Sequence, residues 1–167
     1  GSPAKPDTSS NELQINTTAP TITLTDISDH FLSLSEKDQS LNITGTTTAQ
    51  VGDQVSITGL NGSTYAASVT AGASGQPNVF SALVPAADVT ALTNGVKTVT
   101  ANVTNAFGVA ATPDTFGLTV DFTAPVIDSG ATGGMAENMP ANSEVYDASA
   151  TDSNPVTFSL KAGTGDA

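Results

Sequence analysis

Cysteine, tryptophan and arginine are all missing from this sequence of 167 residues, and histidine occurs once. Without cysteine there is no disulfide to stabilise the fold and no thiolate to bind zinc, and one histidine does not replace it. The absence fits a reducing cytosol, and it fits equally an exported protein that is stabilised by something other than disulfides. No run of eighteen apolar residues exists either, so we expect no membrane insertion.

Positive charge is also scarce. Four lysines face sixteen acidic residues, which gives a formal net charge of −12. Such a chain repels the phosphate backbone, so we expect no nucleic-acid partner. The excess of carboxylates favours divalent cations instead.

Motifs of catalysis are lacking as well. The sequence has no G-x-S-x-G motif, no phosphate-binding glycine loop and no second histidine to work with His30. Acidic pairs without a pocket of aromatic residues do not indicate a glycosidase. We therefore expect that the protein is not an enzyme and that His30 is an exposed loop residue.

The sequence does contain regular alternation of apolar residues with threonine and serine. Six runs show it, at 22–24, 41–43, 55–57, 65–69, 99–103 and 116–120. Turn signals at 60–63, 71–77 and 105–108 separate these runs. The pattern predicts about seven short strands and an all-β, immunoglobulin-like antiparallel β-sandwich. A short helical turn is predicted at 85–92, because Pro85 stands at its start and Asp88 in its first turn.

Two stretches resemble one another, LQINTTAPTIT at 13–23 and LTVDFTAPVID at 118–128. They lie about one hundred positions apart, which is the size of a small domain, so each is interpreted as a last strand entering the next domain. We predict a linker or tag and the end of a preceding repeat at 1–18, an immunoglobulin-like domain at 19–122 and a partial second β-sandwich at 123–167. About forty residues rarely bury enough apolar surface to fold alone.

Strands of that second unit are predicted near 126–127, 144–146 and 156–160. Pro125 keeps the connection before them extended, because proline fixes its own φ and disfavours a helical conformation at Ala124.

Acidic residues gather where the sandwich would have one of its ends. Asp26, Asp29, Glu36 and Asp38 follow the first strand, and we expect them to lie beside Asp88 and Asp121. Two carboxylates about 4 Å apart repel by about 4 kcal/mol at an effective dielectric near 20. Ca²⁺ accepts six to eight oxygen ligands in a tolerant geometry, so we predict Ca²⁺ as the cofactor.

Several segments between residues 19 and 125 resemble the bacterial immunoglobulin-like repeats of giant secreted RTX and biofilm-associated adhesins. They are TAPTITLTDISD, ITGTT, VPAADVTALTNGVKTVTANVTNAFG and LTVDFTAP. The resemblance implies that Asp121, Asp26, Asp29 and Glu36 bind Ca²⁺ at the link between domains. Asn16 and Asn105 replace acidic residues of the family, so we expect weak Ca²⁺ binding, or none, at the other end.

The stretch ENMPANSEVYDASATDSNPVTFSL resembles the first half of a cadherin-like repeat. That resemblance implies Ca²⁺ binding by Glu137, Asp152 and Asn154, the last with an amide in place of the usual carboxylate. Two explanations of the missing strands stay open. Either a later segment of the parent chain completes the domain around an inserted one, or the chain simply stops within it.

Together these features predict a calcium-stabilised structural extender, secreted to a bacterial cell surface, that contacts neighbouring domains of one adhesin and supports cell adhesion and biofilm formation. One alternative is a carbohydrate- or peptide-binding module, or a scaffold for an inserted ligand-binding domain. Such a site needs exposed tryptophan or tyrosine, whereas Tyr65 falls in the predicted core. Another alternative is an accessory domain of a secreted polysaccharide-degrading enzyme.

Overall fold

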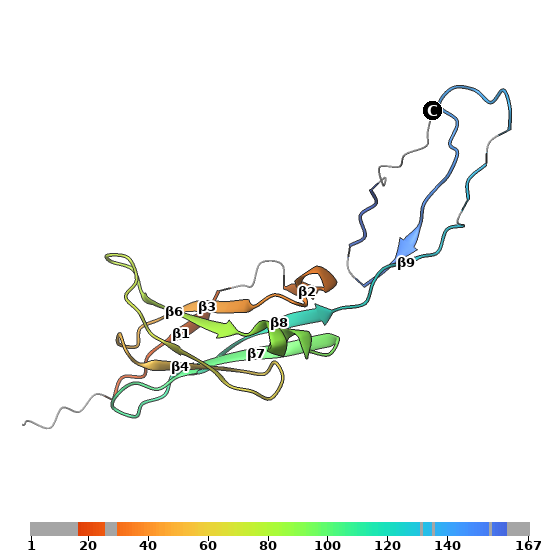
Figure 1. Ribbon diagram of the computed structural model, residues 1–167. Coiled ribbons are helices and arrows are strands. Elements are labelled where there is room, and N and C mark those ends of the chain that lie inside the picture. Colours follow the sequence, from red (N-terminus) through yellow and green to blue (C-terminus); the bar gives the residue numbers. More distant parts are fainter. Residues whose placement is uncertain (1–16, 26–29, 131, 135, 154, 160–167) are drawn as a thin grey trace, which may run out of the picture.

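The alternating residues form two sheets in the computed structural model, which describes residues 17–25, 30–130, 132–134, 136–153 and 155–159 (Figure 1). One sheet has three strands, in the order β1 (Ile22–Leu24), β3 (Leu41–Thr47) and β6 (Asn78–Val84). The other has five, in the order β2 (Phe31–Ser33), β8 (Asp114–Asp121), β7 (Gly95–Val103), β4 (Gln54–Thr58) and β5 (Tyr65–Ser68). The predicted immunoglobulin-like β-sandwich is confirmed.

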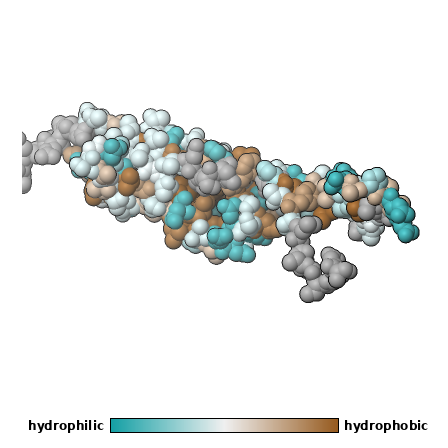
Figure 2. All heavy atoms as spheres, turned by 90° about the horizontal axis from the view of Figure 1, so that it is seen from above, coloured by the Kyte–Doolittle hydropathy of each residue, from teal (hydrophilic) through white to brown (hydrophobic). Residues whose placement is uncertain are grey.

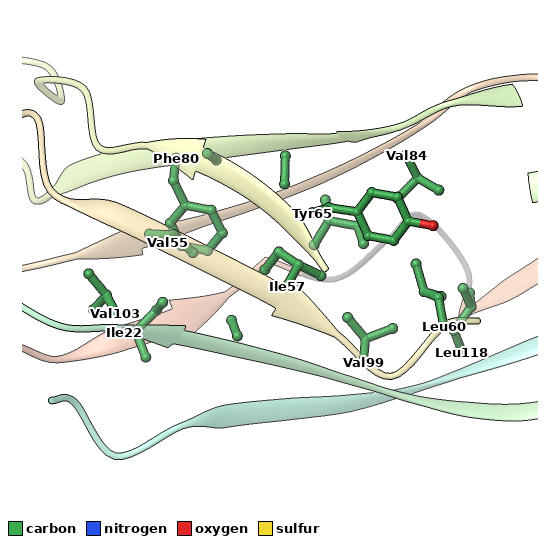
Figure 3. Close-up of a cluster of buried hydrophobic side chains, with 14 of the residues drawn as sticks. Ile22, Val55, Ile57, Leu60, Tyr65, Phe80, Val84, Val99, Val103 and Leu118 are labelled. Atoms are coloured by element: carbon green, nitrogen blue, oxygen red, sulfur yellow. The ribbon is translucent and has the colours of Figure 1, made fainter. Parts of the chain in front are cut away.

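Inward-facing side chains of both sheets form one hydrophobic core (Figure 3). Ile43 of β3 and Val55, Ile57, Val99 and Leu118 of the five-stranded sheet are completely buried. Each such side chain stabilises the fold by about 1.5–3 kcal/mol relative to exposure in water. The period-two pattern of the sequence therefore places the core correctly.

Two strands were not identified from alternation. Strand β2 is only three residues long, too short to show a period. In β6 the inward residues alternate with Val79 and Leu83, which are exposed on the outer face, so the apolar pattern is not periodic. The pairing of β6 along all seven residues of β3 defines it instead.

Strand β2 places the chain in the second sheet after β1 has ended in the first. The amide of Thr25 donates to the carbonyl oxygen of Thr44 (2.9 Å), whereas the carbonyl oxygen of His30 accepts from the amide of Thr119 (2.8 Å). From there β2 runs parallel to β8 until Ser33 lies opposite Asp121. All the other strand pairs of the sandwich are antiparallel.

The predicted helical turn is confirmed as α1 (Ala86–Thr90), with Pro85 at its N-cap and Val89 buried. The hydroxyl of Tyr65 contacts the carboxylate of Asp88 at 3.0 Å, so Asp88 fixes α1 against β5. A second short helix, η1 (Leu34–Glu36), follows β2 directly.

After Pro125 the described chain contains one small sheet, in which β9 (Val126–Ile127) pairs antiparallel with β10 (Ala150–Thr151). The strand predicted at 126–127 is confirmed. Residues 144–146 and the described part of 156–160 are not strands, so those two predictions are wrong. None of the described residues after 122 is buried. These apolar runs have no second sheet to pack against, so nothing stabilises them as strands.

Hydrophobic residues reach the surface of both the sandwich and this second segment (Figure 2). Those of the second segment are Val126, Ile127, Met139, Val145, Tyr146 and Phe158. Among the residues that the structure describes, no helix is long and apolar enough to cross a membrane.

Candidate metal centre

Asp121 is the last residue of β8 and the one acidic side chain buried among the described residues, with 5% of its surface exposed. Its Oδ1 accepts hydrogen bonds from the amide of Thr123 (2.9 Å) and from Nδ2 of Asn94 (3.1 Å). Its Oδ2 is buried and has no hydrogen-bond partner. A buried carboxylate oxygen without a donor is unfavourable, and a bound cation would remove that cost.

The fold explains why this carboxylate is buried. Strand β8 carries Asp121 to the end of the sandwich, where Ser33 of β2 lies opposite it and covers that edge. Two residues further on the chain leaves the sandwich through Thr123 towards Pro125. Asp121 therefore lies at the point where the sandwich meets the next segment, and we call residues 121–125 the junction.

Asn94, in the turn before β7, forms hydrogen bonds with three residues of the junction. Its Nδ2 donates to Oδ1 of Asp121 and to Oγ1 of Thr123 (2.7 Å), and its Oδ1 accepts from the amide of Phe122 (2.9 Å). Asn94 was not among the functional residues predicted from the sequence. Its only signal was a turn-forming Asn-Gly pair before an alternating run.

Hydrogen bonding keeps Asp121 ionised. The backbone amide of Thr123, followed by its side chain, lowers the pKa of Asp121 below the ordinary value near 3.8. Burial acts in the opposite direction, and smaller lowering contributions come from the side chains of Ser153 and Asp152. The junction therefore holds a negative charge whose second oxygen has no donor.

Asp152 approaches the same place from the second segment, directly after β10. A shallow hollow is lined by Ser33, Leu34 and Ser35 of the sandwich, by Thr123 and Pro125, and by Asp152, Pro155, Val156 and Thr157. A neighbouring hollow joins Thr123 and Ala124 to Asp152 and Ser153. The structure thus brings Asp121 and Asp152 together, although they lie in different parts of the chain.

Glu36 lies at the same end of the sandwich. Its Oε2 accepts from the amide (2.9 Å) and hydroxyl (2.7 Å) of Ser33, the residue that is paired with Asp121. One carboxylate oxygen of Glu36 therefore holds the start of η1.

The remaining predicted ligands are not brought to the junction by the described residues. Asp26, Asp29 and Asn154 lie outside them, and Glu137 lies in an exposed turn of the second segment. Asp88 contacts Tyr65, and Asp38 accepts from the hydroxyl of Thr90 (3.2 Å). Within the described residues no three His, Cys, Asp or Glu side chains lie close enough to share a metal ion.

Two lysines at this end have uncharged partners. The ammonium of Lys37 lies 5.5 Å from the centre of the Phe122 ring, and Nζ of Lys97 donates to Oγ1 of Thr93 (2.8 Å). A lysine over an aromatic ring forms a cation–π contact. Neither contact supplies a donor to Oδ2 of Asp121.

The opposite end of the sandwich uses an amide where the junction uses a carboxylate. Oδ1 of Asn105 accepts from the amides of Phe107 and Val109 (both 3.0 Å), and its Nδ2 donates to the carbonyl oxygen of Thr18 (3.2 Å). All three hydrogen bonds join uncharged groups. His30, as expected, is exposed, and its ring meets the edge of Phe116.

No family model and no curated protein matches this sequence. Similar solved structures include a bacterial immunoglobulin-like domain from the M. primoryensis ice-binding adhesin, 28% identical with a TM-score of 0.44, where the match covers 62% of this chain and 99% of that one. A tetra-tandem repeat in the extending region of a large adhesion protein is 28% identical with a TM-score of 0.42, and the match covers 65% and 26% of the two chains.

A third similar structure comes from work on host cell surface retention of a 1.5-MDa bacterial ice-binding adhesin. It is 27% identical with a TM-score of 0.41, and the match covers 62% of this chain and 32% of that one. The chain thus spans about a quarter to a third of the length of these last two structures. All three structures come from adhesins or adhesion proteins.

Proposed function

We propose that this protein is a calcium-stabilised structural module of a large bacterial surface adhesin, which holds one sandwich domain in line with the next. The observation that carries the proposal is the buried, unpartnered Oδ2 of Asp121 at the junction. An extender needs a stiff link between its domains, and a cation shared by both sides of the link supplies one. The resemblance of residues 19–125 to adhesin repeats agrees with this role.

Asp121 and Asp152 would hold the cation, one from each side of the junction. The Thr123 hydroxyl and the second oxygen of Glu36 lie at the same end, and Asp26, Asp29, Glu137 and Asn154 are the further ligands proposed from the sequence. All of them offer oxygen, which suits Ca²⁺ and does not suit zinc. The ion would neutralise the carboxylates and connect the end of β8 to the second segment.

The module would work outside the cell, without enzymatic activity, in contact with neighbouring domains of the same chain. Extracellular calcium sites typically bind at about 10⁻⁴ to 10⁻³ M, so the ion would be bound outside the cell and absent from a calcium-poor cytoplasm. A carbohydrate-binding role is less favoured, because the sequence has no tryptophan and, of its two tyrosines, Tyr65 is buried and Tyr146 alone is exposed.

Thermal unfolding with and without Ca²⁺ tests the proposal. At one hundred times its Kd a bound ion stabilises the fold by about 2.7 kcal/mol, so we expect a Tm several degrees higher in millimolar CaCl₂ than in EDTA. MgCl₂ should have little effect, because Mg²⁺ demands a stricter geometry.

Asp121→Asn should lose most of the calcium-dependent rise. Asp147→Asn is the matched control, since it removes the same charge from an exposed position in the second segment. Equal melting of the wild type in all three media would show that the acids are ordinary solvated loop residues.

A specific observation favours a second proposal, that the unit after Pro125 is completed by strands from a later part of the parent chain. Val126 and Ile127 of β9 are 61% and 68% exposed, although both are typical of buried strands. Amide hydrogen exchange would test it. Protection of residues 126–151 only in a longer chain supports completion, and equal protection in both chains contradicts it.

A further inference from the structure

Asn94 is followed by Gly95, and this pair is chemically labile. In an Asn-Gly pair the backbone nitrogen of glycine can attack the asparagine side chain, because no Cβ obstructs the approach. Gly95 has φ +116°, and an added Cβ would meet no atom within 4 Å, so this turn is open to water. Asn is among the residues that are depleted from proteins selected for thermal endurance.

The other Asn-Gly pair in the sequence, Asn61–Gly62, offers an internal comparison. Gly62 also has a positive φ and open space around it. Oδ1 of Asn61 accepts from the amide of Ser63 and the hydroxyl of Tyr65, both at 3.0 Å. Conversion of Asn61 to aspartate keeps the acceptor for the Ser63 amide and adds a charge beside the Tyr65 hydroxyl, which also contacts Asp88. Neither of these contacts of Asn61 uses its side-chain nitrogen, whereas two contacts of Asn94 do.

At Asn94 the amide nitrogen is the essential atom. Nδ2 donates to the carboxylate of Asp121 and to the hydroxyl of Thr123. An aspartate in this place has only acceptors, so its carboxylate would face Oδ1 of Asp121 at the present donor distance of 3.1 Å. Loss of one nitrogen atom would turn an attraction at the junction into a repulsion.

We propose that Asn94 is a modification site, at which spontaneous deamidation converts the amide that holds the junction into a carboxylate. The Gly95 backbone nitrogen loses its proton to water and forms a bond to Cγ of Asn94. The Cγ–Nδ2 bond breaks and ammonia leaves with a proton from water. A water molecule then opens the cyclic imide, which gives aspartate or isoaspartate at position 94.

The hydrogen bonds of the Asn94 side chain control the rate of its deamidation. Three of them fix the Asn94 side chain onto residues 121–123. Because Nδ2 leaves as ammonia, its hydrogen bonds to Asp121 and Thr123 must break in the reaction, so opening of the junction favours it. Deamidation of Asn94 therefore reports how often these hydrogen bonds at the junction open, whereas Asn61 reports the rate of a turn whose hydrogen bonds go to Ser63 and Tyr65 and not to residues 121–125.

The consequence for calcium rests on the function proposed above. A carboxylate at position 94 adds a hard oxygen donor beside the unpartnered Oδ2 of Asp121. Deamidation then makes the junction weaker without Ca²⁺ and more dependent on Ca²⁺ for its order.

Peptide mapping by mass spectrometry tests the modification on the intact chain. The protein is incubated at mildly alkaline pH in EDTA or in CaCl₂, and aspartate plus isoaspartate is quantified at positions 94 and 61. We expect Asn94 to convert several-fold faster in EDTA than in CaCl₂, and Asn61 to convert equally in both. An Asn94 that stays intact in EDTA while Asn61 converts would overturn the proposal.

The variant Asn94→Asp tests the consequence separately. Its Tm should be lower than that of the wild type in EDTA, and this difference in Tm should shrink or reverse in CaCl₂. Asn102→Asp is the matched control, since it makes the same charge change at the far end of β7. An equal lowering of the Tm in EDTA and in CaCl₂ would show that a carboxylate at position 94 does not interact with the cation. A wild type without any calcium response would defeat the proposed function, and peptide mapping in EDTA would still decide the modification.

Discussion

At the scale of single residues, Asp121 combines two properties that are seldom found together. It is almost completely buried and yet ionised, because the amide and side chain of Thr123 lower its pKa more than burial raises it. The sequence alone indicated an acid at the end of a strand. It could not indicate burial, which depends on how β2 and η1 cover the end of β8.

The lowered pKa has a consequence for acid stability. A carboxyl group with a lower pKa in the folded than in the unfolded state stabilises the fold above its unfolded pKa, and this contribution is lost as pH falls through the folded value. We expect the difference in free energy of unfolding between the wild type and Asp121→Asn to shrink below about pH 4. Urea unfolding in EDTA from neutral to acid pH measures it. A difference that stays constant over this range would contradict the assignment of the shift to Asp121.

At the scale of elements, the sequence predicts the strands that show a period-two alternation of apolar and polar residues. It does not predict the features that depend on contacts with distant residues. The six alternating runs became strands because each has a polar outer and an apolar inner face. Strand β2 and Asn94 were missed, because three residues show no period and a turn asparagine reveals no contact. The same kind of pattern predicts strands at 144–146 and 156–160, yet the described residues there lack a sheet to join.

Packing between β1, β3 and β6 gives a prediction at this scale. A Cβ on Gly45 of β3 would collide with the Thr23 carbonyl oxygen and the Phe80 ring. Gly45→Ala should therefore lower the free energy of unfolding by about 1–3 kcal/mol or more, as overpacking of a core site does.

The control is Gly117→Ala in β8, where the nearest atom is Cγ1 of Val96 at 3.7 Å. Gly117→Ala should change stability by no more than about 0.5 kcal/mol. Similar urea midpoints for the two variants would contradict this account of the sheet.

At the scale of the whole molecule, the described chain is elongated, with the sandwich and the second segment placed one after the other (Figure 1). Their link is short and contains Pro125, so its stiffness depends on few contacts. The repeated Thr-Ala-Pro motif predicts an extended connection at this position, because proline restricts the backbone wherever it occurs.

Small-angle X-ray scattering can follow the link. If Ca²⁺ bridges Asp121 and Asp152, the distribution of interatomic distances should be narrower in CaCl₂ than in EDTA, and its longest distances should be better defined. Asp121→Asn in CaCl₂ should resemble the wild type in EDTA. Identical scattering of the wild type in both media would mean that the link is equally stiff without the ion.

The parallel pairing of β2 with β8 determines how this molecule responds to mechanical tension. The chain enters the sandwich at the end where Thr18 contacts Asn105 and leaves it at the opposite end, after Asp121. A force that separates the two ends pulls β2 and β8 past one another along their length. Their hydrogen bonds are then strained together in shear and cannot open one at a time. A strand of only three residues thereby resists extension of the whole domain.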